Sequence, residues 1–253
     1  MSDFEITNKV VQANELIQQA NWQMNMMPLK LFKTIISCID TEHPKKEVCI
    51  GKKELAEFMD VGENYTYLKK QMKSLQRQIV DIKKGDDVIS LSVLPKVVWK
   101  ANSDDVICHF DADIMPYLVE LKGMFLQYDV AALKDFDSKY GVILYEYLLS
   151  RERQENATIL TNPRHEYYIS IDNLRRLTGT EDKYPRMENF QRKVLKAAEN
   201  DINNANVEFL IRWETVKKGR KIEGIRFKIR RRTSFKETTF DNVAFSERLL
   251  DKI

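Results

Sequence analysis

The chain has 253 residues, of which 43% are hydrophobic, 10% aromatic and 31% charged, a composition that excludes an intrinsically disordered protein. Its 41 Lys and Arg residues face 38 Asp and Glu residues, which gives a net charge of only +3. A role on nucleic acid therefore depends on how the basic residues are distributed along the chain.

The sequence offers no sign of export or of membrane insertion. The opening residues MSDFEITNK do not resemble a secretory signal, and no run of about 18 apolar residues is present. Its three cysteines form no CxxC pair, as in proteins of a reducing compartment. We expect a cytoplasmic protein with no membrane association, of a length that suits two domains.

The first half has the element order of a winged helix. Apolar periodicity predicts helices over residues 8–20, 28–39, 52–59 and 64–80. A short β-prone run at 48–50 precedes the third helix, and a turn at 60–64 precedes the fourth, whose expected buried face includes Ile79. Two β-rich runs, 88–100 and 106–110, predict a hairpin, and the stretch 111–135 is expected to be an interrupted helical bridge. Helix, strand, helix, turn, helix and hairpin describe a winged helix.

The second half repeats this order. Helices are predicted over residues 140–149, 172–177 and 185–203, with a β-prone run at 167–171 and a turn at Gly179. Ser170 or Asp172 caps the short helix, and strands 207–216 and 222–230 form a hairpin. We therefore predict an α+β fold of two tandem winged-helix domains, 1–135 and 136–232. A tail, 233–253, is expected to pack on a domain or on a partner.

The long helix of the second half separates into two faces at 100° per residue. The apolar face holds Met187, Phe190, Val194, Ala197, Ala198 and Ile202. The opposite face holds Arg186, Asn189, Arg192, Lys193 and Lys196, with Lys183 and Tyr184 just before the helix. Arg and Lys read guanine edges in the major groove and Asn reads adenine. A merely solvated basic face is the alternative for this helix alone.

The hairpin that follows adds basic residues that favour DNA. Its tip contains Lys217, Lys218, Arg220 and Lys221, and its second strand ends in Arg230, Arg231 and Arg232. Contacts from such residues to phosphates supply affinity and orientation, while contacts from the helix select the sequence. The helix and wing together predict a domain that reads double-stranded DNA.

The first half has a fainter version of the same pattern. On its last predicted helix Lys69, Lys70, Lys73 and Arg77 share a face, with Tyr65 and Tyr67 near the start. Its hairpin region carries aspartates in place of a basic tip. We expect weaker contacts, mostly with phosphates, or an additional dimer surface; a solvated helix is the alternative.

No catalytic or cofactor site is predicted. His43, His109 and His165 are isolated, so no pair is available to hold a metal for strand cleavage. Cys38, His43 and Cys49 lack a fourth ligand for zinc. The run 51–53, Gly-Lys-Lys, lacks the earlier glycine and the hydroxyl of a phosphate loop.

The second half contains a specific set of residues at a characteristic spacing: Lys139, Tyr140, Gly141, Leu144, Tyr145, Glu146, Leu174, Arg175, Gly179, Tyr184, Asn189, Phe190, Val194, Leu195, Asp201, Ile202, Asn203, Lys218 to Ile222, Arg226 and Phe227. Through these residues the stretch 138–229 resembles the second winged-helix domain of the iteron-binding plasmid replication initiators. Asp201 departs from the Glu expected before Ile-Asn. The first half is similar in element order and in Asn8 and Leu16, a looser match.

The resemblance implies a function in plasmid replication. Such a protein binds tandem direct repeats, the iterons, in a bacterial plasmid origin, opens the nearby AT-rich duplex and recruits the host initiator and replicative helicase. Monomers do this, whereas dimers formed through domain one repress the protein's own gene. A winged-helix transcriptional regulator that binds an inverted repeat is the alternative. A third hypothesis is an enzyme that cleaves DNA strands, but this sequence lacks the metal ligands that such cleavage needs.

Overall fold

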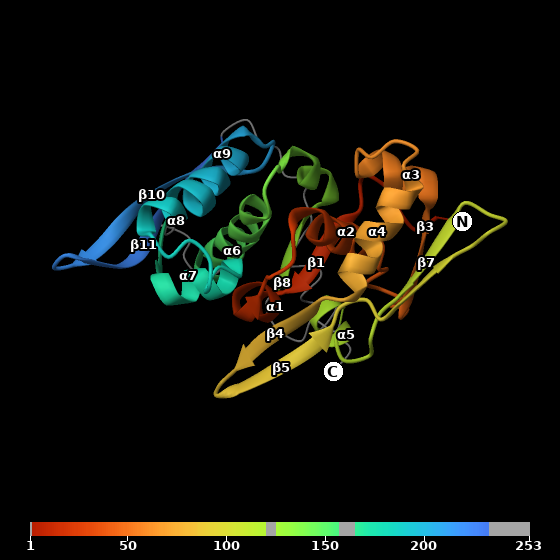
Figure 1. The fold of residues 1–253 in the computed structure, drawn as a ribbon, viewed down its shortest axis with the longest axis horizontal. Coiled ribbons are helices and arrows are strands. Elements are labelled where there is room, and N and C mark those ends of the chain that lie inside the picture. Colours follow the sequence, from red (N-terminus) through yellow and green to blue (C-terminus); the bar gives the residue numbers. More distant parts are fainter. Residues whose placement is uncertain (1, 120–124, 157–164, 233–253) are drawn as a thin grey trace.

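A computed structural model describes residues 2–119, 125–156 and 165–232. Its two halves follow each other along the longest axis of the molecule, and a β-hairpin projects from each end (Figure 1). In the described residues no helix is both long and apolar enough to cross a lipid bilayer.

The first half contains five α-helices, one 3₁₀ helix and eight strands among the described residues. The helices are α1 (Asn14–Gln19), α2 (Met26–Ile36), α3 (Lys52–Phe58), α4 (Tyr65–Gln76), α5 (Met115–Leu118) and the 3₁₀ helix η1 (Val130–Asp135). The strands are β1 (Lys9–Ala13), β2 (Ala20–Asn21), β3 (Glu47–Gly51), β4 (Ile79–Lys84), β5 (Asp87–Ser92), β6 (Lys96–Trp99), β7 (Asp105–His109) and β8 (Phe125–Asp129).

The second half is smaller. Its elements are α6 (Lys139–Asn156), β9 (Glu166–Ser170), α7 (Ile171–Thr178), α8 (Met187–Phe190), the π-helical turn η2 (Gln191–Leu195), α9 (Lys196–Asn204), β10 (Phe209–Lys218) and β11 (Lys221–Arg231). The helix α6 is buried along most of its length, because it packs against both halves.

Both halves contain the same winged-helix topology. The sheet of the first is ordered β3-β7-β6 and that of the second β9-β11-β10, with antiparallel neighbours throughout. In each, the strand before the helix-turn-helix pairs with the last strand of the wing. Leu55 of α3 and Leu174 of α7 are both fully buried. The repeated order predicted from the sequence is present in space.

Two of the first-half predictions are wrong near the start and at the bridge. Residues 9–13 are a strand, β1, which pairs with β8, and only 14–19 form a helix. The bridge contains α5, β8 and η1 rather than an interrupted helix. The partner of β1 lies more than 100 residues away in sequence, and local periodicity carries no information about such a pairing.

The helix predicted over 64–80 ends at Gln76. From Ile79 to Lys84 the chain forms β4, which pairs with β5 around Gly85 at φ +65°. Ile79 was expected on the buried helix face and is 53% exposed. Val80 and Ile82 are fully buried because they alternate with outward residues, as strand geometry requires. The wing is therefore β6–β7, and β4–β5 is a separate hairpin.

A buried polar network joins the two halves. Lys33 of α2 forms an ion pair of 2.9 Å with Glu146 of α6, and both side chains are almost completely buried. Gln12 donates to Glu146 over 2.6 Å and accepts from Lys33 over 2.7 Å, while the Tyr128 hydroxyl donates to Glu146 over 2.7 Å. Every charge in this network has a partner, as buried charges require.

A second contact between the halves involves the turn after α7. The Lys139 ammonium donates to the carbonyl oxygen of Trp22 over 2.9 Å. Gly179, at φ +59°, lies so close to the same segment that a Cβ atom there would approach the Trp22 oxygen to 2.5 Å. A glycine is required at this turn for its backbone conformation and for this close approach.

Candidate nucleic-acid interface

The helix-turn-helix of the second half begins at a capped helix. Ser170, not Asp172, is the N-cap of α7, and its hydroxyl accepts from the backbone N–H of Asn173. The helix ends at Gly179 in the left-handed conformation, a common helix terminus. Cap and terminus fix the length of α7 and therefore the point at which the chain turns toward the next helix.

Arg175 holds that turn in place. Its guanidinium donates to the carbonyl oxygens of Thr180, Lys183 and Tyr184 at 3.0, 2.7 and 2.9 Å. It also lies 4.5 Å from the centre of the Phe190 ring, a cation–π arrangement. Tyr184 has φ +52°, a strained conformation for a tyrosine, and Arg175 supports it. Sequence reasoning assigned no role to Arg175, because its partners are backbone atoms.

The second helix of the motif runs from α8 through the π-helical turn to α9. Phe190, Val194, Ala198 and Ile202 are fully buried, which confirms the apolar face, while Met187 and Ala197 are half-buried. Leu195 is also fully buried; the predicted apolar face did not include it, although it lies about 20° from Ile202 at uniform α-helical spacing.

The opposite face of this helix is basic and accessible. Arg186, Arg192, Lys193 and Lys196 are exposed, and Asn189 is half-buried. Arg186 is the N-cap residue of α8 rather than a residue within the helix. Arg192 donates to the Asn189 side-chain oxygen over 3.1 Å, and Lys196 pairs with Glu199 over 2.9 Å. Lys183 is exposed and Tyr184 is half-buried at the preceding turn.

The wing tip extends away from the body of the molecule (Figure 1). Lys217, Lys218, Arg220 and Lys221 are all exposed there, around Gly219 at φ +60°. Lys218 approaches Glu223 at 3.7 Å with 82% of its side chain exposed. An ion pair this exposed is weak, so the tip remains a cluster of accessible positive charge.

The three arginines that end β11 do not join this cluster. Arg230 and Arg231 pair in register with Leu210 and Phe209 at the far end of the hairpin, roughly 30 Å from the tip at the usual strand rise. Arg231 bonds to the buried Glu152 over 2.9 Å, and Arg232 donates to the carbonyl oxygen of Asn203 over 2.7 Å. The structure divides what the sequence suggested was one basic cluster.

In the first half α4 carries the corresponding face. Asn64 caps it by accepting from the Tyr67 N–H over 3.0 Å. Lys69, Lys70, Lys73, Arg77 and Tyr67 are exposed, and Tyr65 is half-buried. The Lys69 ammonium lies 5.2 Å from the centre of the Trp99 ring on wing strand β6, so helix and wing are in contact.

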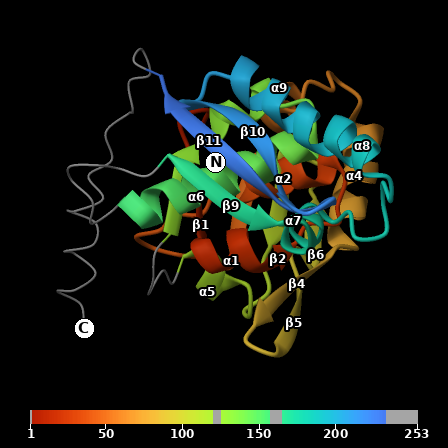
Figure 2. The same cartoon turned by 90° about the vertical axis from the view of Figure 1, so that its left-hand side faces the viewer.

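The two basic helices lie on one side of the molecule. Figure 2 shows α4 and α8 together at that side, while the wings β6–β7 and β10–β11 project from opposite ends in Figure 1. Two basic helices on the same side of the molecule suit a bipartite site on one side of a duplex.

No three His, Cys, Asp or Glu side chains gather as a metal site in the described ranges. Burial raises the pKa of the Cys108 thiol to about 12 and that of Cys38 well above its usual value, so both are unreactive thiols. The predicted absence of catalytic residues, metal and cofactor stays a prediction. The predicted tail, 233–253, lies outside the described residues.

Family comparisons match both halves. A family described as "Initiator Replication protein, WH1" matches residues 9–149, more than half of the chain, and one described as "Initiator Rep protein, WH2" matches 170–229. A replication initiation protein of Escherichia coli is 24% identical over 212 residues, which are 78% of this chain and 63% of the relative. The chain therefore spans less than two thirds of that relative's length.

One solved structure has the same fold. The crystal structure of the Pi initiator protein in complex with iteron DNA superposes with a TM-score of 0.70 at 20% identity, and covers 91% of this chain and 100% of that one. These matches confirm the tandem winged-helix fold and the resemblance carried by residues 138–229. The chain belongs to the family of initiator replication proteins with WH1 and WH2 domains.

Proposed function

We propose that this protein is a plasmid replication initiator that binds double-stranded direct repeats at its origin. The observation that carries the proposal is that the basic face of α8–α9 and the basic wing tip of the same domain are both exposed, with α4 on the same side of the molecule as α8 (Figure 2). The solved relative is bound to iteron DNA, and the family is one of replication initiators, which supports the same role here.

The residues proposed to contact DNA fall into two groups. Arg186, Asn189, Arg192, Lys193 and Lys196 read bases, with Lys183 and Tyr184 beside them. The wing residues Lys217, Lys218, Arg220 and Lys221 bind phosphates, as do the α4 residues Lys69, Lys70, Lys73 and Arg77 with Tyr65 and Tyr67. Of the three terminal arginines, Arg230 is exposed and remains a candidate, whereas Arg231 and Arg232 bind protein groups.

The later steps are also part of the proposal. Bound to its repeats as a monomer in the bacterial cytoplasm, the protein opens the adjacent AT-rich duplex and recruits the host initiator and replicative helicase. Dimers formed through residues 1–135 repress its own gene. It acts without a cofactor and without enzymatic activity of its own.

The test is binding of purified protein to duplexes that carry its replicon's repeats in direct, inverted or scrambled arrangement. We expect one protein to bind per direct repeat, with affinity that falls steeply between about 50 and 200 mM salt, because phosphate contacts release counterions. A preference for a single inverted repeat would instead identify a transcriptional regulator. Equal affinity for scrambled DNA would mean that the basic surface binds DNA by charge alone, without reading its sequence.

A further inference from the structure

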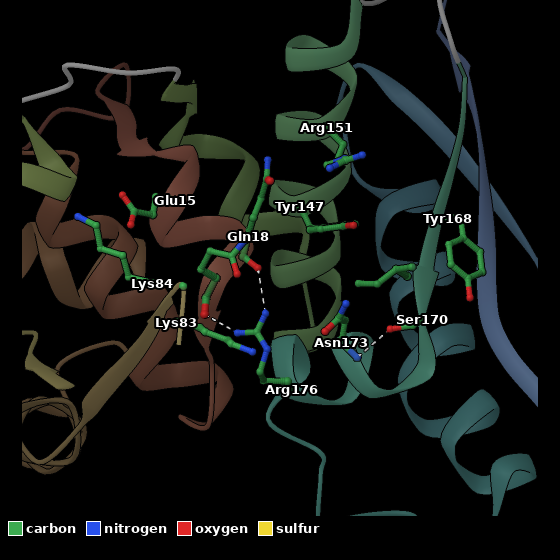
Figure 3. Close-up of a pocket in the computed structure, with 13 residues that line it drawn as sticks. Glu15, Gln18, Lys83, Lys84, Tyr147, Arg151, Tyr168, Ser170, Asn173 and Arg176 are labelled. Carbon is green, nitrogen blue, oxygen red and sulfur yellow. Dashed lines mark hydrogen bonds between the residues drawn. The ribbon is translucent and has the colours of Figure 1, made fainter. Parts of the chain in front are cut away.

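A cleft opens between the two halves, away from the basic helices. Its volume is about 720 Å³, within the usual range for small-molecule sites of roughly 300–1,000 Å³. It lies where α1 and the turn of the β4–β5 hairpin face α6, β9 and the start of α7 (Figure 3). None of the residues proposed to contact DNA lines it.

The lining of the cleft is strongly basic. Lys83 and Lys84 enter it from β4, Arg151 from α6 and Arg176 from α7, and Glu15 is the acidic residue among the lining side chains. The two lysines are exposed, and in the described residues no ion pair involves either of them. A recessed site with this excess of positive charge favours an anionic ligand.

The two arginines are held by protein groups at the cleft wall. Arg176 donates to the carbonyl oxygens of Gln18 and Gln19, and Arg151 pairs with Glu155. These contacts fix where the guanidinium groups lie and keep their charge beside the cavity. The lysines are left to approach a ligand directly.

Tyr147 directs its hydroxyl into the cleft. The residue is only 7% exposed, and Figure 3 shows its hydroxyl pointing from α6 toward β9. Within the described residues this hydroxyl has no hydrogen-bond partner. The hydroxyl faces the cavity and is therefore available to donate a hydrogen bond to a ligand oxygen. The lining also includes the Asn173 amide and the half-exposed ring of Tyr168.

We propose that this cleft binds a nucleoside phosphate. The phosphate groups lie against Lys83, Lys84 and Arg151 and accept a hydrogen bond from Tyr147. The base lies toward Tyr168 and Asn173, which offer an aromatic face and an amide edge. The ligand contacts both halves of the chain, and its binding requires no DNA.

The test uses the full chain without DNA, titrated with ATP by isothermal calorimetry. We expect saturable binding of one nucleotide per chain, with pyrophosphate as a competitor and adenosine without effect. Lys83→Ser and Tyr147→Phe should each weaken binding about tenfold, because each removes a bond to a charged group. Lys46→Ser is the matched control, since Lys46 is an exposed lysine far from the cleft lining, and it should leave the affinity unchanged.

Several results would overturn the proposal. Absence of saturable binding, or equal affinity in all three variants and the wild type, means that the cleft is not the site. An acidic peptide that displaces ATP as well as pyrophosphate does indicates a protein partner instead. Loss of DNA binding in Lys83→Ser, with no nucleotide binding in the wild type, assigns the cleft to the DNA backbone. If the protein binds ATP but does not bind direct repeats, the proposed function is wrong and the nucleotide site in the cleft is still supported.

Discussion

At the residue scale, the charge on Glu146 is compensated mainly by Lys33. Burial lowers the pKa of Lys33, and the neighbouring Glu146 opposes that shift. Lys33→Met leaves a buried carboxylate with neutral partners, so the free energy of unfolding should fall by about 3–5 kcal/mol. Urea unfolding measures the loss.

The matched control is the double variant Lys33→Met with Glu146→Gln. It removes both charges and retains a side-chain oxygen to accept from Gln12 and Tyr128. Most of the lost stability should return, because no unpaired charge remains. If the double variant is as unstable as the single one, the loss comes from packing around Lys33 rather than from charge.

Asn189 and Lys218 separate sequence reading from phosphate binding. Asn189→Ala removes an amide from the helix face and frees Arg192 from its bond, so affinity for the cognate repeat should fall by about 1–3 kcal/mol and specificity should relax. Lys218→Ala should weaken cognate and random DNA alike and reduce the salt dependence. Fluorescence anisotropy on both duplexes distinguishes the two patterns, and equal losses for both variants would contradict the assignment.

The sequence predicts individual side chains well where one helix determines them. The apolar face of α8–α9 was correct at Phe190, Val194, Ala198 and Ile202, since each lies on the side that packs inward. The predicted face omitted Leu195, which is also buried at the edge of that side next to Ile202. Arg175, Arg231 and Arg232 bind carbonyl oxygens or a carboxylate from distant segments, which no local pattern reveals.

At the element scale, two turn glycines form a matched pair. Gly179 and Gly219 both have φ near +60°, but a Cβ at Gly179 meets the Trp22 backbone at 2.5 Å whereas nothing lies within 4 Å of Gly219. Gly219→Ala should cost about 1–2 kcal/mol from backbone conformation alone. Gly179→Ala should cost clearly more, because backbone atoms must move. Thermal unfolding compares them, and equal losses would show that the halves separate easily at this turn.

Element order was predictable and strand pairing was less so. Helices α2, α3, α6 and α7 and the hairpin β10–β11 follow from periodicity and turn residues. The strand β1 was read as a helix because its partner β8 is remote. The sequence analysis assigned the start of β4 to the preceding helix and β5 to the wing. The reason is that Ile79 continues the helical spacing of α4, although α4 ends at Gln76 and β4 begins at Ile79.

At the scale of the whole molecule, stability should depend on pH through Lys139. Burial lowers its pKa to about 8, with Lys183 adding to the effect, whereas the unfolded chain keeps the ordinary value. Between those two values the unfolded state binds more protons, so the free energy of unfolding rises as pH increases. Lys139→Met should reduce that rise.

The measurement is urea unfolding of both proteins from about pH 8 to 9.5, below the range in which tyrosines ionise in the unfolded chain. The comparison between the two proteins isolates Lys139, because Lys30 and Lys33, whose pKa values are also lowered by burial, are common to both. Parallel curves would mean that Lys139 keeps its ordinary pKa in the folded protein.

The Lys33–Glu146 pair has a consequence for synthesis on the ribosome. Lys33 is synthesised more than 100 residues before Glu146. The strand β1 is likewise synthesised more than 100 residues before its partner β8. Until then the nascent first half holds an uncompensated cation at its centre and an unpaired strand at its start, both unfavourable in a folded core. Its final packing is therefore delayed until α6 is translated, and a gene truncated at residue 135 should yield a product that proteases remove.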